Sequence, residues 1–308
     1  MAQSNPLRIG TRGSRLALFQ AELVRAALSR TGRNCEILAI KTTGDRIQDR
    51  PLADAGGKGL FTKELEEALL RNEIDLAVHS MKDVPTALPS GLMIGAILQR
   101  EDPRDAFVSQ KAESLTGLAS GARVGTSSVR RTAQVLRERP DLQTGLLRGN
   151  VETRLRKLDA GEVDAVILAV AGLKRLALEG RVTKLLDPAS WLPALGQGAI
   201  GIEIREADAG VRNALAPIDH AQTAHELACE RAFQAALDGS CRTPIGGLAR
   251  VAGARLSFRG EVLSPDGKES VPTSFECALR SSDPRADAER AGREAGLELR
   301  PKVLGWLA

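Results

Sequence analysis

Short apolar runs alternate with amphipathic stretches through about the first two hundred residues, a pattern that predicts strands alternating with helices. The run at residues 163–170 is almost wholly apolar, which is typical of a central parallel strand buried on both faces. This βαβ order predicts an α/β fold whose functional groups lie at the carboxyl ends of strands. The expected strands cover residues 7–10, 35–41, 74–78, 163–170 and 199–204, and the expected helices cover residues 60–70 and 129–139.

The stretch that follows the first expected strand is also predicted to be an amphipathic helix. Its apolar residues Leu16, Phe19, Leu23 and Ala27 recur at helical spacing, so we expect them to form the buried face.

The pattern changes after about residue 220. Thr223 and Glu226 have the spacing of a capping box for a helix that runs to Leu237, and Gly239 is placed to end that helix. Alternating strands around a turn at residues 265–267 follow, and then a C-terminal helix. This part of the chain therefore predicts a small α+β domain.

A chain of 308 residues is long for a single core, so two or three domains are expected. The chain is predicted to pass from the first α/β domain into a second one at residues 101–105, and to return to the first at residues 195–198. The predicted fold has two lobes with a cleft between them, plus the small C-terminal domain. The expected boundaries are 1–100 with 199–217 for the first lobe, 101–198 for the second lobe, and 218–308 for the C-terminal domain.

Composition excludes several classes of protein. No apolar run approaches the eighteen or more residues that a membrane span needs, and residues 1–6 have no signal-peptide core, so a cytoplasmic protein is expected. Aromatic residues make up 3% of the chain and tyrosine is missing, which argues against a protein that binds single-stranded nucleic acid by stacking bases on aromatic side chains. The cysteines form no C-x-x-C pair, which argues against a zinc site and a disulfide framework; they are Cys35, Cys229, Cys241 and Cys277.

Positive charge is concentrated in residues 123–157, which hold nine basic and three acidic residues and so carry +6. The whole chain carries +4, so the remainder sums to −2. Within this segment, a strand ending at Val124 leads through a Gly-Thr-Ser-Ser turn into a helix, and the free N–H groups at such a helix start bind anions.

Arg130 and Arg131 lie in the first turn of that helix, where the helix dipole favours acids. An acidic ligand would remove the conflict, and Arg148 and Arg154 follow close behind in the sequence. Arginine suits bidentate capture of carboxylate or phosphate, so the ligand should carry several negative groups. The alternative is an ordinary Ser-capped helix with solvated arginines.

Four further residues are candidates for chemistry, each with a plainer alternative. Asp83 follows an expected strand and suits a catalytic carboxylate, although Asp before Val-Pro is also a common turn choice. Cys241 lies in a Gly-Ser loop beside Arg242 and suits a nucleophile or attachment point, although free cysteines are more often buried. Lys58 in its glycine loop could reach an anion or simply be solvated, and His79 fits a hydrogen-bonded core residue better than a base.

The chain resembles the porphobilinogen deaminase (hydroxymethylbilane synthase) family over essentially its whole length. Seven stretches carry this resemblance, and they follow one another in the order and with the spacing of the family. They are Ile9-Gly10-Thr11-Arg12-Gly13-Ser14, Gly56-Gly57-Lys58-Gly59-Leu60-Phe61, His79-Ser80-Met81-Lys82-Asp83-Val84-Pro85, Glu101-Asp102-Pro103-Arg104-Asp105, Gly125-Thr126-Ser127-Ser128-Val129-Arg130-Arg131, Leu147-Arg148-Gly149-Asn150 and Leu195-Gly196-Gln197-Gly198. The resemblance implies two lobes like a periplasmic anion-binding protein, followed by a C-terminal domain that carries the cofactor cysteine.

The resemblance also implies an activity. The family joins four porphobilinogen molecules head to tail onto a dipyrromethane cofactor with loss of ammonia, and then releases hydroxymethylbilane by hydrolysis. Cys241 matches the cysteine that holds the cofactor by a thioether, and Asp83 matches the catalytic carboxylate. Ser240 is a minor departure, because many relatives have glycine there.

The remaining site residues are carried over from the family position by position. No metal is implied, and the enzyme is expected to be a monomer that binds neither nucleic acid nor membrane. The implied cofactor contacts are Lys82, Asp83, Thr126, Ser127, Ser128, Arg130, Arg131, Arg148, Gly149 and Arg154, and the implied substrate contacts are Arg12, Ser14, Lys58, Arg148, Arg154, Arg175 and Gln197.

Two other classes of protein share some of these features. A non-enzymatic anion carrier would share the two lobes and the arginines, but it would need no attached cofactor. A nucleic-acid binder would share the basic segment, but it would also need a groove-reading module, and the sequence contains no recognisable one.

Overall fold

The computed structural model describes residues 6–46, 59–237, 243–280 and 282–307. The chain forms two compact units. Unit 1 contains the described residues of Met1–Ile47, Gly56–Glu101 and Ala199–Ala224. Unit 2 contains those of Asp102–Gly198 and His225–Ala308. The predicted mixed α/β class is confirmed, because strands and helices alternate through both units.

Unit 1 is built on a five-stranded sheet with the order β2-β1-β3-β10-β4. β1 pairs in parallel with β2 and β3, whereas β10 runs antiparallel between β3 and β4. The chain therefore returns from residues 102–198 to complete the first sheet. The elements are β1 (Leu7–Arg12), α1 (Arg15–Arg30), β2 (Cys35–Ile40), α2 (Thr43–Arg46), α3 (Lys63–Leu70), β3 (Leu76–Ser80), β4 (Leu92–Ile97), β10 (Ile200–Arg205) and α7 (Ala209–Leu215).

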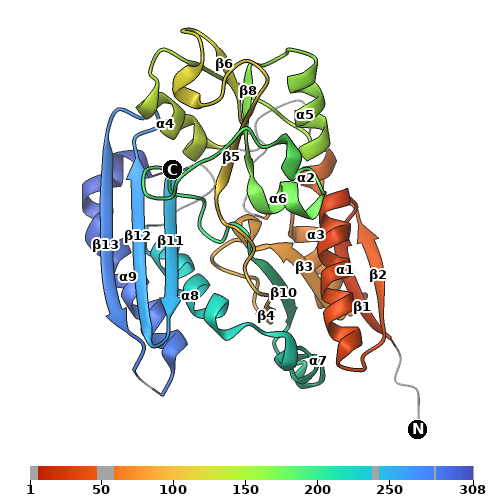
Figure 1. Cartoon of the computed structure of the whole chain (residues 1–308). Helices are drawn as coiled ribbons and strands as arrows, with labels where there is room; N and C mark the ends of the chain where they lie inside the picture. Colours follow the sequence, from red (N-terminus) through yellow and green to blue (C-terminus); the bar gives the residue numbers. More distant parts are fainter. Residues whose placement is uncertain (1–5, 47–58, 238–242, 281, 308) are drawn as a thin grey trace. The chain divides into compact units, whose positions relative to one another are not determined.

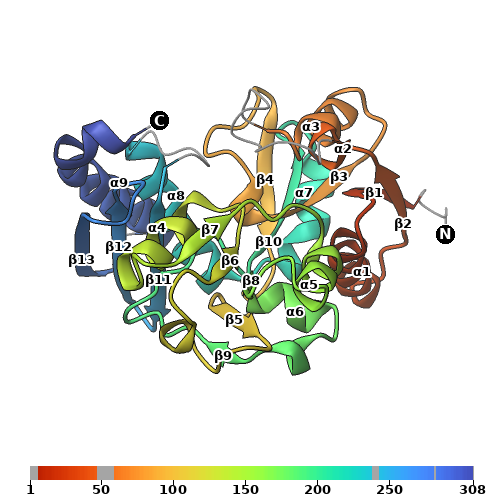
Figure 2. The same cartoon turned by 90° about the horizontal axis from the view of Figure 1, so that it is seen from above.

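Helix α1 lies against the sheet beside β1 and β2 (Figures 1 and 2), but its buried face differs from the predicted one. Phe19 and Leu23 are exposed, at 40% and 39%. Of the other two predicted residues, Ala27 is buried and Leu16 is partly buried. The rest of the buried face contains Ala17, Gln20, Ala21, Val24 and Leu28. Helical spacing predicted the helix but not the whole of its buried face, which includes small side chains that let the helix approach the sheet closely.

Unit 2 contains a second five-stranded sheet with the order β7-β6-β8-β5-β9. β8 is the central strand, as predicted, but it pairs in parallel only with β6 and runs antiparallel to β5. An apolar run indicates burial on both faces and does not determine strand direction. The elements are β5 (Asp105–Ser109), β6 (Arg123–Gly125), α4 (Val129–Glu138), β7 (Gln143–Gly145), α5 (Val151–Asp159), β8 (Ala165–Ala169), α6 (Val170–Arg175) and β9 (Lys184–Leu185).

The C-terminal part of unit 2 is an antiparallel sheet of β11 (Ile245–Ala252), β12 (Arg255–Leu263) and β13 (Ser270–Ala278). Helices α8 (Ala221–Ala236) and α9 (Pro284–Val303) lie beside this sheet (Figure 1), and their apolar side chains form one core cluster with those of the strands. The predicted small α+β region is thus present. Because it shares a compact unit with residues 102–198, the predicted domain boundary near residue 218 stays a proposal.

The predicted capping box of α8 is wrong. The helix begins at Ala221, and the backbone N–H of Thr223 donates to Nδ1 of His220 at 3.2 Å. The Glu226 carboxylate accepts from the backbone N–H of Val251 at 3.1 Å. Because the Glu226 carboxylate binds a backbone N–H of a buried strand, it does not cap its own helix. The local sequence pattern could not reveal this distant partner.

Gly292 in α9 is required by its contact with α8, and we expect Gly292→Ala to lower the free energy of unfolding. A Cβ at this position would lie 2.1 Å from the carbonyl oxygen of Cys229, which is backbone and cannot move aside. Overpacking of this kind typically costs about 1–3 kcal/mol. Urea denaturation measures the loss, and Gly180→Ala, where no heavy atom lies within 4 Å of the new methyl group, is the matched control.

Candidate functional site

The predicted anion-binding turn connects β6 to α4 in unit 2. Ser128 is the N-cap of α4, and its hydroxyl accepts from the backbone N–H of Arg131 at 3.4 Å. The Thr126 hydroxyl accepts from the N–H of Ser128 at 3.2 Å, and the Ser127 hydroxyl donates to the carbonyl of Leu147 at 2.5 Å. These hydroxyl groups therefore hold the turn in shape, and α4 begins where the sequence predicted.

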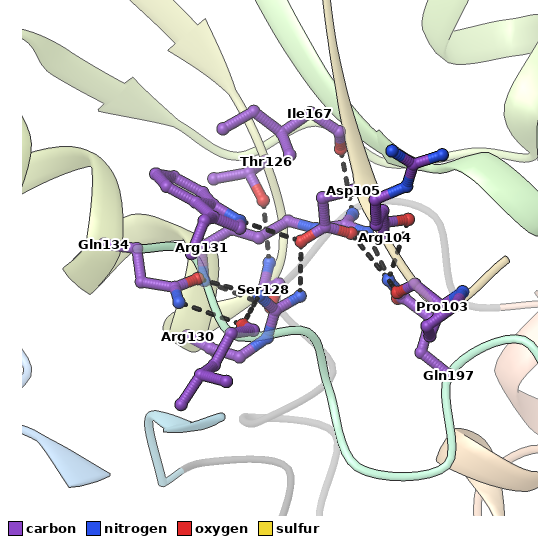
Figure 3. A network of polar contacts seen from close by, with 12 residues as sticks. Pro103, Arg104, Asp105, Thr126, Ser128, Arg130, Arg131, Gln134, Ile167 and Gln197 are labelled. Carbon is purple, nitrogen blue, oxygen red and sulfur yellow. Dashed lines mark hydrogen bonds and ion pairs between the residues drawn. The ribbon is translucent and has the colours of Figure 1, made fainter. Parts of the chain in front are cut away.

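Arg130 and Arg131 point inward, and both are buried. Each donates from a terminal nitrogen to the carboxylate of Asp105, Arg130 at 2.8 Å and Arg131 at 2.7 Å (Figure 3). Arg130 also donates to Gln134 at 2.7 Å, and Arg131 donates to the carbonyl of Ile167 at 2.8 Å. The two arginines are thus fixed components of unit 2, not solvated side chains.

Asp105 is the first residue of β5 and is 1% exposed. Each of its two carboxylate oxygens accepts two hydrogen bonds. Oδ1 accepts from Arg131 and from Nε2 of Gln197 at 2.8 Å. Oδ2 accepts from Arg130 and from the indole N–H of Trp191 at 3.0 Å. Burial alone would raise the pKa of Asp105, but the charges and hydrogen bonds of the two arginines outweigh burial and hold the pKa far below its usual value.

Sequence reasoning missed this carboxylate as a site residue. In the sequence, Asp105 is only one residue of a matching motif, and the position of Arg130 and Arg131 in the first turn of a helix indicates an acidic ligand or solvated side chains. The first acidic partner of both arginines is a residue of the chain itself. One signal was present in the sequence, because a carboxylate at the start of an apolar strand needs a buried partner.

The network still leaves hydrogen-bonding capacity unused. Two guanidinium groups and one carboxylate give the cluster of Asp105, Arg130 and Arg131 a net charge of +1. The Nε atoms of both arginines are buried and have no partner among the described residues. Buried donors without acceptors are costly, so an additional acceptor, such as a ligand carboxylate, would stabilise this cluster.

The other predicted residues of unit 2 lie on the loops that follow its strands and at its helix ends. Gly149 adopts a φ of +115°, and a Cβ there would lie 2.6 Å from Thr153, so glycine is required. Arg154 donates from Nε to the carbonyl of Gly149 at 2.9 Å, and Arg175 donates to the carbonyl of Gly198 at 2.7 Å. Arg148 is partly buried, and burial lowers its pKa.

In unit 1, Asp83 ends a short 3₁₀ turn, Met81–Asp83, directly after β3. The turn is held by Met81, which is buried against Gly201 of β10 so closely that a Cβ on the glycine would lie 2.0 Å from the sulfur. Asp83 and Lys82 are partly exposed. The strand end therefore presents a carboxylate at a fixed position that solvent can still reach.

Arg12 ends β1 and contacts two neighbours within unit 1. Its guanidinium bonds to the carboxylate of Asp45 and stacks over the ring of Phe61, 4.0 Å from the centroid. Burial alone would raise the pKa of Asp45, but the bond and charge of Arg12 hold that pKa below its usual value. Ser14 caps α1, accepting from the N–H of Ala17 at 3.3 Å.

His79 is a buried core residue, as expected, and its Nε2 lies 2.9 Å from the carboxylate of Glu203. Burial raises the pKa of the thiols of Cys35, Cys229 and Cys277, so the described cysteines are weak nucleophiles. Cys241 and Lys58 lie outside the described residues.

Two features are missing from the part of the chain that the structure describes. It contains no group of three or more side chains arranged to bind a metal ion. None of its helices combines the length and the apolar character that crossing a bilayer requires.

Two family models match the chain. The model for the dipyromethane cofactor-binding domain of porphobilinogen deaminase matches residues 7–213, and the model for the C-terminal domain of that enzyme matches residues 224–301. Together they span most of the sequence.

Relatives that match over most of their length agree with these family matches. The chain is 55% identical over 299 residues to the porphobilinogen deaminase of Nitrobacter hamburgensis, covering 96% of this chain and 93% of the relative. It is 51% identical over 295 residues to that of Syntrophobacter fumaroxidans, covering 95% and 94%. Among solved structures, a periplasmic substrate-binding protein of an ABC transporter from Coxiella burnetii aligns with a TM-score of 0.45 at 15% identity, covering 69% of this chain and 91% of that one.

Proposed function

Because this chain belongs to the porphobilinogen deaminase family, we propose that Asp83, Cys241 and the basic residues around α4 carry its chemistry. The family activity is that of a transferase. It condenses four porphobilinogen molecules head to tail onto a dipyrromethane cofactor, with loss of ammonia, and releases linear hydroxymethylbilane by hydrolysis. The family resemblance inferred from the sequence motifs is confirmed.

The observation that best supports the proposed cofactor site is the pair of unsatisfied Nε donors on Arg130 and Arg131. A dipyrromethane built from porphobilinogen carries acetate and propionate side chains, and carboxylates are the acceptors that arginine binds best. The residues present therefore fit the cofactor. When bound, the dipyrromethane supplies the primer to which the substrate units are added.

We propose that Thr126, Ser127 and Ser128 position the start of α4 against this cofactor. Their hydroxyl groups fix the turn, so the N–H groups of the first helical turn can face an anion. Arg148 and Gly149 extend the proposed site along the loop before α5, and Arg154 extends it into that helix. Lys82 and Asp83 complete the proposed set of cofactor contacts. Arg12, Ser14, Lys58, Arg175 and Gln197 are the proposed substrate contacts, together with Arg148 and Arg154.

Asp83 is the proposed catalytic carboxylate. Loss of ammonia from porphobilinogen leaves an electron-poor methylene-pyrrole cation, which a fixed negative charge stabilises. A unit charge at about 4 Å contributes roughly 4 kcal/mol at an effective dielectric near 20. The partial exposure of Asp83 at a strand end is compatible with contact to a substrate.

The attachment of the cofactor to Cys241 gives the most direct test. We expect the purified protein to exceed its sequence mass by one dipyrromethane, and peptide mapping by mass spectrometry should place the adduct on Cys241. Support comes from the raised pKa of the three described cysteines, which makes each of them a poor attachment point. An adduct on one of those three, or active enzyme with unmodified Cys241, would contradict the assignment.

We also propose that the enzyme acts in the cytoplasm as a monomer and binds neither nucleic acid nor membrane. The cysteines in the described part of the chain, Cys35, Cys229 and Cys277, are free thiols, which suits a reducing compartment. Light scattering of the holoprotein across a range of concentrations tests the monomeric state.

A further inference from the structure

Asp105 has no part in the chemistry proposed above, yet it holds both arginines of the proposed cofactor site. We propose that Asp105 is a positioning residue: it is a permanent internal counter-ion that fixes Arg130 and Arg131 in the orientation needed to bind cofactor carboxylates. This inference rests on the proposed cofactor site, and it adds a residue that acts through the two arginines without touching the ligand.

The opposite role for Asp105 would be that of a placeholder, occupying the arginines until a cofactor carboxylate displaces it. The saturation of its oxygens argues against displacement. Besides the arginines, Oδ1 accepts from Gln197 and Oδ2 from Trp191, and both donors are themselves buried. Moving the carboxylate away would break four hydrogen bonds from buried donors and would remove the one acceptor that the described residues offer to the indole N–H of Trp191 (Figure 3).

The neighbours of Asp105 are equally fixed. Gln197 also donates to the carbonyl of Pro103 at 2.8 Å, which ties the loop before β10 to the start of β5. Arg130 donates to the carbonyl of Leu192 at 2.9 Å, and Gln134 donates to the same carbonyl at 3.0 Å. Each arginine thus has at least two protein acceptors for its terminal nitrogens, and its Nε–H remains without one.

A net-charge effect and a positioning effect of Asp105 predict opposite changes in cofactor binding for Asp105→Asn. If only net charge mattered, removing a carboxylate from a +1 cluster should strengthen the binding of an acidic cofactor. If Asp105 positions the arginines, its loss leaves two buried like charges that repel each other and adopt new orientations. The cofactor-loaded fraction should then fall, by about tenfold or more, because charged hydrogen bonds depend strongly on geometry.

The experiment compares Asp105→Asn with Glu261→Gln by intact mass and thermal unfolding of the freshly purified proteins. Glu261 is a matched control because it is a buried carboxylate that binds the same helix, accepting from Arg137 at 2.6 Å, but it does not bond Arg130 or Arg131. We expect both variants to lose stability and only Asp105→Asn to lose most of its dipyrromethane. Equal loading of the two variants would overturn the positioning role.

A double-mutant cycle separates action through the arginines from a general structural effect. In an Arg131→Gln background, Asp105→Asn should reduce loading much less than in the wild type, since the residue to be positioned has already been removed. An equal reduction in both backgrounds would contradict the inference.

A spectroscopic measurement follows the network without reference to the cofactor. Trp191 is one of two tryptophans, so a Trp306→Phe background isolates its emission. Asp105→Asn should shift that emission, because the indole N–H loses its carboxylate partner, whereas Glu261→Gln should leave it unchanged. An unshifted spectrum would contradict the network, and a wild-type protein without dipyrromethane would instead overturn the proposed function.

Discussion

Replacing Asp83 by alanine should slow turnover by roughly 10²–10⁴-fold, the usual scale for a positioned acid–base or electrostatic group. The side chain is partly exposed, and the turn that carries it is held by the buried Met81. The fold should therefore be retained, and the cofactor should be retained as well, because its proposed attachment to Cys241 and its proposed arginine contacts are unchanged. Steady-state kinetics with porphobilinogen measure the loss, and intact mass verifies that the variant is still loaded.

Two substitutions at the same position separate charge from shape. Asp83→Asn keeps the size of the side chain and removes its charge, so it should be nearly as slow as the alanine variant. Asp83→Glu keeps the charge and moves it by about one bond, so it should retain more activity than either. Turnover of Asp83→Ala within a few-fold of the wild type would show that the carboxylate is not catalytic.

The sequence predicted those elements that depend on local pattern. The strand, turn and helix around residues 124–138 are found as expected, because a Gly-Thr-Ser-Ser segment provides both the turn and the N-cap at Ser128. The five strands predicted from apolar runs are also found, as β1, β2, β3, β8 and β10, whereas β4 and β5 were not predicted. The residues of this turn and of its N-cap are adjacent in the sequence, so local pattern is sufficient to predict them.

Features that depend on tertiary partners were not predictable in this way. Asp105 is 25 residues from Arg130 and 86 from Trp191, and no periodicity connects them. Glu226 accepts a hydrogen bond from the N–H of Val251 on a distant strand, so the capping box predicted from its spacing to Thr223 is not formed. In each case a polar group was committed to a partner that only the folded chain brings near.

The buried face of α1 failed for a related reason. Helical spacing predicted a face with Phe19 and Leu23, but the face that packs on the sheet contains the small residues Ala17 and Ala21, which let the helix lie close to it. The same preference for close approach makes Gly292 necessary between α8 and α9. Periodicity identifies an amphipathic helix reliably, whereas the face that is buried depends on the surface it meets.

Replacing Arg131 by leucine should yield mostly apo-protein. The side chain is buried and bonds Asp105, and we propose that it also binds a cofactor carboxylate. Breaking a buried ion pair from one side costs about 3–5 kcal/mol, so stability must be measured alongside loading. Arg137→Leu is the control for stability, because Arg137 lies on the same helix and bonds Glu261 instead.

Arg12→Leu should give the opposite outcome, a protein that carries dipyrromethane but stalls during elongation or shows a raised KM. Arg12 lies in unit 1, where it pairs with Asp45 and stacks on Phe61, and we propose that it contacts incoming substrate. Intact mass spectrometry of both variants, before and after addition of porphobilinogen, distinguishes loading from elongation. Should Arg12→Leu and Arg131→Leu load the cofactor equally and elongate equally, the division of roles between these two arginines is wrong.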